Sequence, residues 1–139
     1  MRILLLSILV LGAALAASDD DQKAIRKGPA RRTSPSSGGE MYRAYCAACH
    51  GLGGKGDGPA SSALKPAATD LTQLAKRNSG KFPELQVFGA INGDVQVPAH
   101  GSKDMPVWGV VFRGMGDNGV PGAQLRIRNL TRYIESLQH

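Results

Sequence analysis

Two cysteines and a histidine stand together in the segment Cys46-Ala47-Ala48-Cys49-His50, and the 139-residue chain has no other cysteine. Two thiols at this spacing can form thioether bonds with the two vinyl groups of one haem. The imidazole that follows directly is placed to bind the iron from the same side. The motif therefore predicts one covalently attached haem c, held by Cys46 and Cys49, with His50 as an iron ligand.

Three other uses of the cysteine pair are a redox-active disulfide, a zinc site and a structural disulfide. A redox disulfide of this spacing would follow a strand in an alternating strand–helix pattern, which the sequence lacks. A structural zinc site needs four ligands, and neither His100 nor His139 stands at zinc-finger spacing from the pair. A plain disulfide would leave His50 without a role. Haem attachment is therefore the favoured hypothesis.

A ligand on the far side of the iron would favour electron transfer over the binding of small molecules. Met105 is followed by Pro106, which stiffens the backbone after the sulfur, and by Trp108, which is placed to wall the pocket. A methionine is more often a flexible core filler, but Met105 lies in a polar loop rather than in an apolar stripe. We expect Met105 to be the second iron ligand, with His100 as the alternative.

The N-terminal residues have the three parts of a secretory signal peptide. These parts are a basic start at Arg2, an apolar run over residues 3–11, and small residues at Ala14 and Ala16. We assign residues 1–17 to this signal. The alternative is an uncleaved anchor, although a membrane span needs about 20 apolar residues and this run is shorter. We expect a periplasmic or otherwise exported bacterial protein with no membrane span after cleavage.

The composition changes after the signal. Residues 18–36 have few apolar side chains and no periodicity, which is typical of a disordered linker. The folded domain is expected over residues 37–139. From residue 36 onward there are 11 Lys and Arg against 8 Asp and Glu, a formal charge of +3, which two haem propionates would lower to about +1. Such a domain, without a basic stripe, gives no support to nucleic-acid binding.

Helix-capping residues divide the domain into helical segments. Expected helices begin at Ser37, Asp70, Pro83 and Pro121. In the first, Ser37 and Glu40 fit a capping box, in which each side chain bonds the backbone of the other residue. This helix should break at the glycine-rich loop after His50. No alternating run indicates a strand, so the sequence predicts an all-α fold of three to five short helices and long loops wrapped around one haem.

Apolar spacing indicates which side of the later helices is buried. In the helix after Pro83, the expected buried residues are Leu85, Val87, Phe88 and Ile91. In the last helix, a stripe of spacings three and four is formed by Ile127, Leu130, Ile134 and Leu137. The stretch between these two helices, from Val95 to Val111, is expected to be a loop.

Together these features resemble the class I cytochrome c family. The similarity rests on residues 41–51, 56–60, 105–109 and 130–134, whereas residues 80–101 match no subgroup pattern. The resemblance implies a small all-α fold in which an N-terminal helix crosses a C-terminal helix, with Tyr42 or Tyr45 against Tyr133. It also implies that the Pro59 carbonyl accepts the Nδ1 proton of His50, a bond that would orient the ring.

The expected function is that of a one-electron carrier in an exported respiratory or other redox chain, with a low-spin iron ligated by His50 and Met105. We expect a monomer that exchanges electrons with redox partner proteins and is not itself an enzyme. One alternative is a cytochrome subunit of an oxidase or dehydrogenase complex. Another is a peroxidase or gas-binding haem protein, which would need an open sixth position on the iron.

Overall fold

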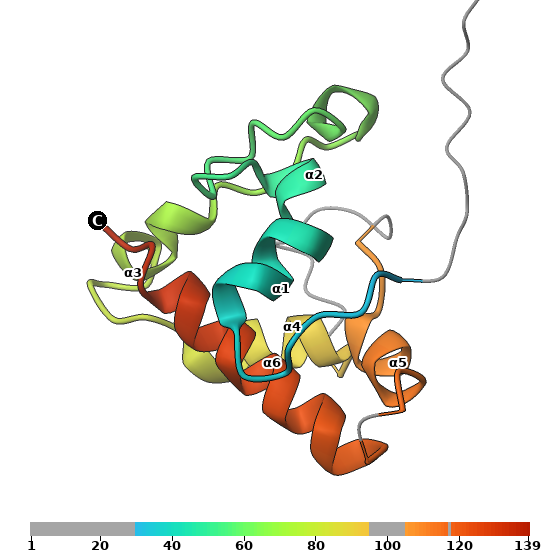
Figure 1. Ribbon diagram of the computed structural model, residues 1–139. Coiled ribbons are helices and arrows are strands. Elements are labelled where there is room, and N and C mark those ends of the chain that lie inside the picture. The colour runs from blue at the N-terminus through green and yellow to red at the C-terminus, as the bar shows by residue number, and fades with distance from the viewer. Residues whose placement is uncertain (1–29, 95–104, 117) are drawn as a thin grey trace, which may run out of the picture.

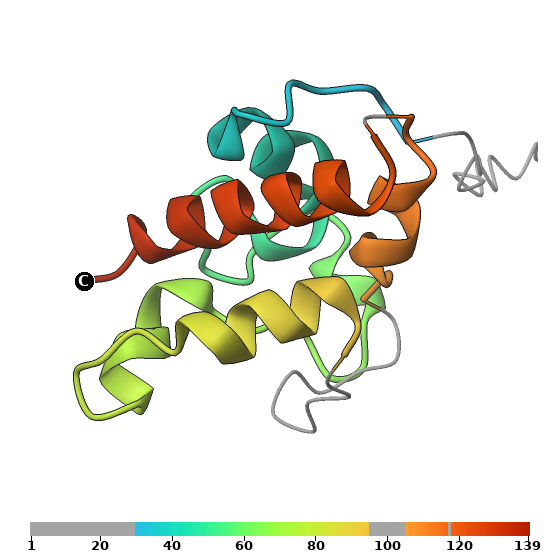
Figure 2. The same cartoon turned by 90° about the horizontal axis from the view of Figure 1, so that it is seen from below.

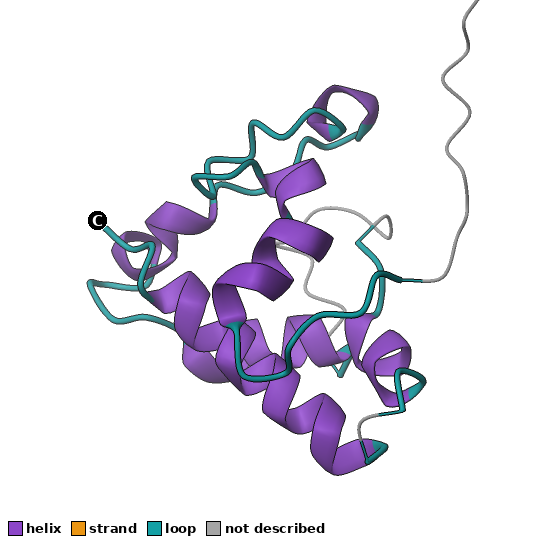
Figure 3. Cartoon of the chain, viewed as in Figure 1, coloured by secondary structure: helices purple, strands orange, loops and turns teal. Residues whose placement is uncertain are grey.

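The computed structural model describes residues 30–94, 105–116 and 118–139, and the regular structure in these ranges is entirely helical (Figure 3). The α-helices are α1 (Gly38–Tyr45), α2 (Ala47–His50), α3 (Leu74–Arg77), α4 (Glu84–Asn92), α5 (Trp108–Arg113) and α6 (Val120–Glu135). Short 3-10 turns, η1 and η2, lie at Ser61–Ala63 and Leu71–Gln73. The predicted all-α fold is confirmed. The expected signal segment and the alternative ligand His100 lie outside the described residues.

The long C-terminal helix α6 lies at the centre of the fold. It packs against α1, α4 and α5, and Figure 2 shows it between α1 and α4. At the crossing with α1, the rings of Tyr42 and Tyr133 lie 5.2 Å apart between centroids. The implied helix crossing is therefore present, and Tyr42 rather than Tyr45 makes the aromatic contact. Within the described ranges, no helix is long and apolar enough to cross a membrane.

The start of α1 confirms half of the expected capping box. The Ser37 hydroxyl accepts the backbone N–H of Glu40 at 3.3 Å. The Glu40 carboxylate, however, accepts the backbone N–H of Ser34 at 3.2 Å and not that of Ser37. The helix then breaks at Cys46, and α2 ends at His50, just before Gly51, whose φ of +77° favours glycine. Caps thus set both ends of the segment that carries the cysteine motif.

The buried side of α4 differs from the prediction at one position. Val87 and Ile91 are buried as expected and Phe88 is partly buried, but Leu85 is 86% exposed. In an α-helix each residue turns by about 100°, so Leu85 lies about 200° around the axis from Val87. Val87 and Ile91 lie four positions apart, so they share the side of α4 that belongs to the apolar core. The prediction of a buried Leu85 was therefore wrong.

Part of the predicted loop from Val95 to Val111 is helical. Helix α5 begins at Trp108, and its Phe112 is fully buried. Gly109 allows α5 to pack closely against the end of α4, because a Cβ at this position would lie only 2.4 Å from the Asn92 carbonyl oxygen. The sequence pattern missed α5 because a helix of only six residues with one buried aromatic has too little periodicity to detect.

Residues 30–36 form a segment that we call the N-terminal strap, which runs across the helices toward α5 (Figure 1). Its Thr33 is only 8% exposed, and the Asn129 side chain of α6 donates to the Pro35 carbonyl at 2.9 Å. The expected disordered linker therefore does not extend to residue 36. Side chains of the helices satisfy the polar groups of the strap, so it belongs to the folded unit.

Candidate haem site

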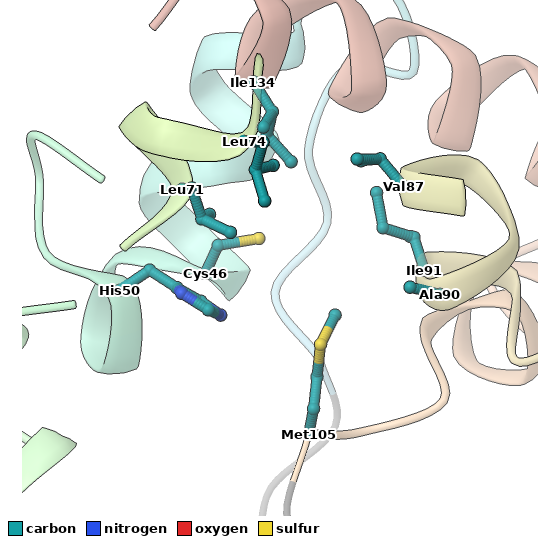
Figure 4. A pocket seen from close by; sticks show the side chains of 9 residues that line it. All are labelled: Cys46, His50, Leu71, Leu74, Val87, Ala90, Ile91, Met105 and Ile134. Carbon is teal, nitrogen blue, oxygen red and sulfur yellow. The ribbon is translucent and has the colours of Figure 1, made fainter. Parts of the chain in front are cut away.

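Two adjoining cavities lie between α2, α4 and the segment before α5 (Figure 4). Cys46, His50 and Met105 line both. The first is completed by the apolar side chains of Leu71, Leu74, Val87, Ala90, Ile91 and Ile134. The second is completed by Tyr45, Cys49, Leu64, Ala67, Ala68, Thr69, Pro106 and Trp108.

The two cysteines stand at the edge of this space as free thiols. Cys46 is 7% exposed and its sulfur points toward the cavity, whereas Cys49 is partly exposed. Burial raises the pKa of Cys46 to about 12, with a smaller contribution from Cys49. The Cys46 thiol is therefore neutral at ordinary pH and lies against apolar walls, where a large apolar cofactor would fit.

The His50 ring extends into the cavity from the end of α2. Its Nδ1 lies 2.9 Å from the Thr69 carbonyl oxygen, so Nδ1 carries a proton and donates it to that carbonyl. Nε2 is then left with a free lone pair. Burial lowers the pKa of His50, and the bond to Thr69 opposes this only in part. The histidine is thus held as a neutral, oriented imidazole, the form that binds metals.

The expected role of Pro59 in orienting His50 is not seen. Pro59 is exposed, and the residues on either side of it are tied to the outer side of α2. The Gly58 N–H donates to the Cys49 carbonyl at 3.1 Å, and the Ala60 N–H to the Ala48 carbonyl at 2.8 Å. These bonds hold the loop away from Nδ1 of His50. The Thr69 carbonyl is the acceptor in place of the expected Pro59 carbonyl.

Met105 faces His50 from the opposite wall of the cavity (Figure 4). The other described methionines lie elsewhere. The Met41 sulfur contacts Nη1 of Arg126 at 3.7 Å, and the Met115 sulfur lies 3.8 Å from the Tyr45 hydroxyl. Met105 is therefore the methionine that lines the cavity within the described ranges. Trp108 lines the second cavity with Met105.

Thr69 is the site residue that sequence reasoning missed. It directly precedes Asp70, whose carboxylate accepts the Thr72 N–H at 2.9 Å and caps η2. A carbonyl just before a helix cap accepts no hydrogen bond within the helix. The position of Thr69 before the cap Asp70 was therefore the one sign in the sequence that its carbonyl could accept a bond from another side chain. Its direction toward His50 depends on the path of the chain between residues 60 and 69, which the sequence pattern does not define.

Comparison with known proteins agrees with this geometry. Residues 35–138 match the family model for cytochrome c. The chain belongs to the cytochrome c family. No curated protein and no solved structure gives a significant match. Cytochrome c domains bind haem c covalently and exchange electrons with redox partners, and the paired thiols, the oriented imidazole and the apolar walls of this cytochrome fit that cofactor.

The segment that orients His50 should make the stability of this cytochrome depend on pH. The Thr72 hydroxyl and N–H lower the pKa of Asp70 below its usual range. The unfolded carboxyl has a pKa of about 4. The stabilising contribution is therefore present above about pH 4 and is lost as the pH falls through the lower folded pKa.

We expect Asp70→Asn to lose less stability than the wild type between about pH 4 and pH 2. Denaturant unfolding of the haem-loaded protein across this range measures the difference. Thr72→Val removes the partner hydroxyl and should also flatten the dependence. Equal pH slopes in Asp70→Asn and the wild type would show that the carboxylate has no such role.

Proposed function

We propose that this cytochrome carries single electrons, with one haem c attached through Cys46 and Cys49 and ligated by His50 and Met105. The observation that carries the proposal is the approach of an imidazole and a thioether from opposite walls of one apolar cavity. When bound, the haem supplies the chemistry, because its iron alternates between the ferrous and ferric states.

The residues of the chain would tune this exchange in three ways. The Thr69 carbonyl fixes the His50 ring through Nδ1 and makes the imidazole a stronger donor. The Met105 thioether is a soft ligand, which favours the ferrous state and raises the reduction potential. The apolar side chains Leu71, Val87 and Ile91 line the space and exclude water from it.

The placement of Met105 favours a carrier over a peroxidase or a gas-binding protein. Both alternatives require an open sixth position on the iron, and the presence of Met105 on the wall that faces His50 supports a filled one. A role as the cytochrome subunit of an oxidase or dehydrogenase complex would use the same site. We further propose that the protein is exported and monomeric and passes electrons to redox partner proteins, with the apolar run of residues 3–11 supporting export.

The proposal is tested on the full chain expressed in a host that exports and matures c-type cytochromes. Mass spectrometry should show one covalent haem and the loss of about the first 17 residues. Absorption spectra should show a low-spin iron whose reduced form does not bind carbon monoxide at neutral pH. The Cys49→Ser variant serves as the control, since it retains at most one thioether bond. Recovery of an exported chain with two free thiols and no haem would refute the proposal.

A further inference from the structure

A buried arginine of α6 begins a chain of hydrogen bonds that passes through the N-terminal strap. The Arg126 side chain is only 2% exposed. Its Nη2 donates to the Thr33 carbonyl at 2.8 Å, and its Nη1 donates to the Thr33 hydroxyl at 3.0 Å. A guanidinium can only donate, so the Thr33 oxygen must be the acceptor in the second bond. The proton of the Thr33 hydroxyl is then free for another partner.

That partner is Tyr45, the residue immediately before Cys46. The Thr33 hydroxyl lies 2.8 Å from the Tyr45 hydroxyl, and the Tyr45 hydroxyl donates to the Arg31 carbonyl. Tyr45 has one proton, so its bond to Arg31 requires Thr33 to donate to the Tyr45 oxygen. The donors therefore run in one direction from Arg126 through Thr33 and Tyr45 to Arg31. Bonds aligned in this way polarise and strengthen one another.

The ring of Tyr45 links this chain to the Met105 wall of the cavity. It lies 5.1 Å from the Trp108 ring and 5.5 Å from the Phe112 ring, between centroids. Trp108 follows Met105 by three residues, and both line the same cavity with Tyr45. The position of the Tyr45 ring thus limits where Trp108, and with it the backbone that carries Met105, can lie.

We infer that the N-terminal strap positions Met105, and that Arg126, Thr33 and Tyr45 are positioning residues for the sulfur ligand. With the chain of bonds intact, Tyr45 and Trp108 hold the Met105 segment against the cavity. With the chain broken, the strap and the Tyr45 ring loosen, and the sulfur leaves the iron more readily. The inference rests on the proposed function, because it takes Met105 to be the iron ligand.

The test measures how readily imidazole displaces Met105 in the oxidised, haem-loaded protein. Tyr45→Phe keeps the ring and removes the hydroxyl, and Thr33→Val removes the middle of the chain. We expect each to lower the imidazole concentration for half-displacement by about three- to tenfold, the effect of one lost hydrogen bond. In the variant that carries both substitutions, the change in imidazole displacement should be much smaller than the two single changes would give if they were independent, because both substitutions break the same chain of hydrogen bonds.

Tyr42→Phe is the matched control. Tyr42 lies on the same helix, and its buried hydroxyl donates to the Gly51 carbonyl at 2.8 Å, on the His50 side of the site. Its removal should lower thermal stability by a similar amount and leave imidazole displacement within about twofold of the wild type.

Two results would overturn the inference. The first is that the Tyr45→Phe protein and the Thr33→Val protein both bind imidazole as the wild type does. The other is an equal change in Tyr42→Phe, which would indicate a general loss of stability. A wild-type protein without the sulfur-to-iron charge-transfer band would instead remove Met105 from the proposed function, and the inference with it.

Discussion

Replacing Met105 with alanine should abolish the long-wavelength charge-transfer band between sulfur and ferric iron. It should also lower the reduction potential by on the order of 100 mV, a modest part of the range of about 0.8 V that axial ligands set. The variant loses the thioether that faces His50 across the cavity, so the preference for the ferrous state weakens. The reduced variant should also bind carbon monoxide at neutral pH. Absorption spectroscopy during a redox titration measures the first two changes.

Met115→Leu is the control for a lost methionine that is not a ligand. The Met115 side chain is buried, and it does not line the cavity that holds His50 and Met105. Leucine has a similar volume, so the cost in stability should stay below about 1.5 kcal/mol. The charge-transfer band should remain in this variant. A Met105→Ala protein with an unchanged spectrum would show that another group ligates the iron.

Local signals in the sequence were enough to predict the fold class and to propose half of the candidate site. The cysteine motif lies within a few residues, and the stripe of α6 repeats over several turns, so neither depends on tertiary structure. Ile127, Leu130 and Ile134 are buried as that stripe predicts. The helix cap at Asp70 has the same local character, because its side chain bonds the backbone two residues later.

The features that were missed depend on contacts between distant segments. The strap has a composition typical of disorder, yet Thr33 bonds to Arg126, 93 positions away. The acceptor for His50 is 19 positions away, at Thr69 and not at Pro59. Composition and periodicity carry no information on such pairings, because a polar segment is ordered only where other elements supply its partners. The order of the strap and the bond from His50 to Thr69 could therefore be found only from the three-dimensional structure.

The largest expected effect on stability comes from Gly38, where α1 crosses α6. A Cβ at this position would lie 2.3 Å from the Asn129 carbonyl oxygen and 2.8 Å from the Tyr133 Cβ. Both atoms belong to the rigid frame of α6 and cannot move aside as a flexible side chain would. A side chain at position 38 therefore forces α1 away from α6, which separates the rings of Tyr42 and Tyr133.

We expect Gly38→Val to lower the free energy of unfolding by about 3 kcal/mol or more, at the upper end of overpacking effects. Helix propensity acts in the opposite direction, since glycine is less favourable than most residues in a helix by up to about 1 kcal/mol. A loss of stability in Gly38→Val would show that the clash with α6 outweighs the gain in helix propensity, and a gain would show the reverse.

Gly53→Val is the control, because a Cβ at Gly53 meets no atom within 4 Å, and its effect on the free energy of unfolding should stay within about 0.5 kcal/mol. Denaturant unfolding of the haem-loaded proteins gives both values. A Gly38→Val protein as stable as the wild type would mean that the helices do not cross at this glycine.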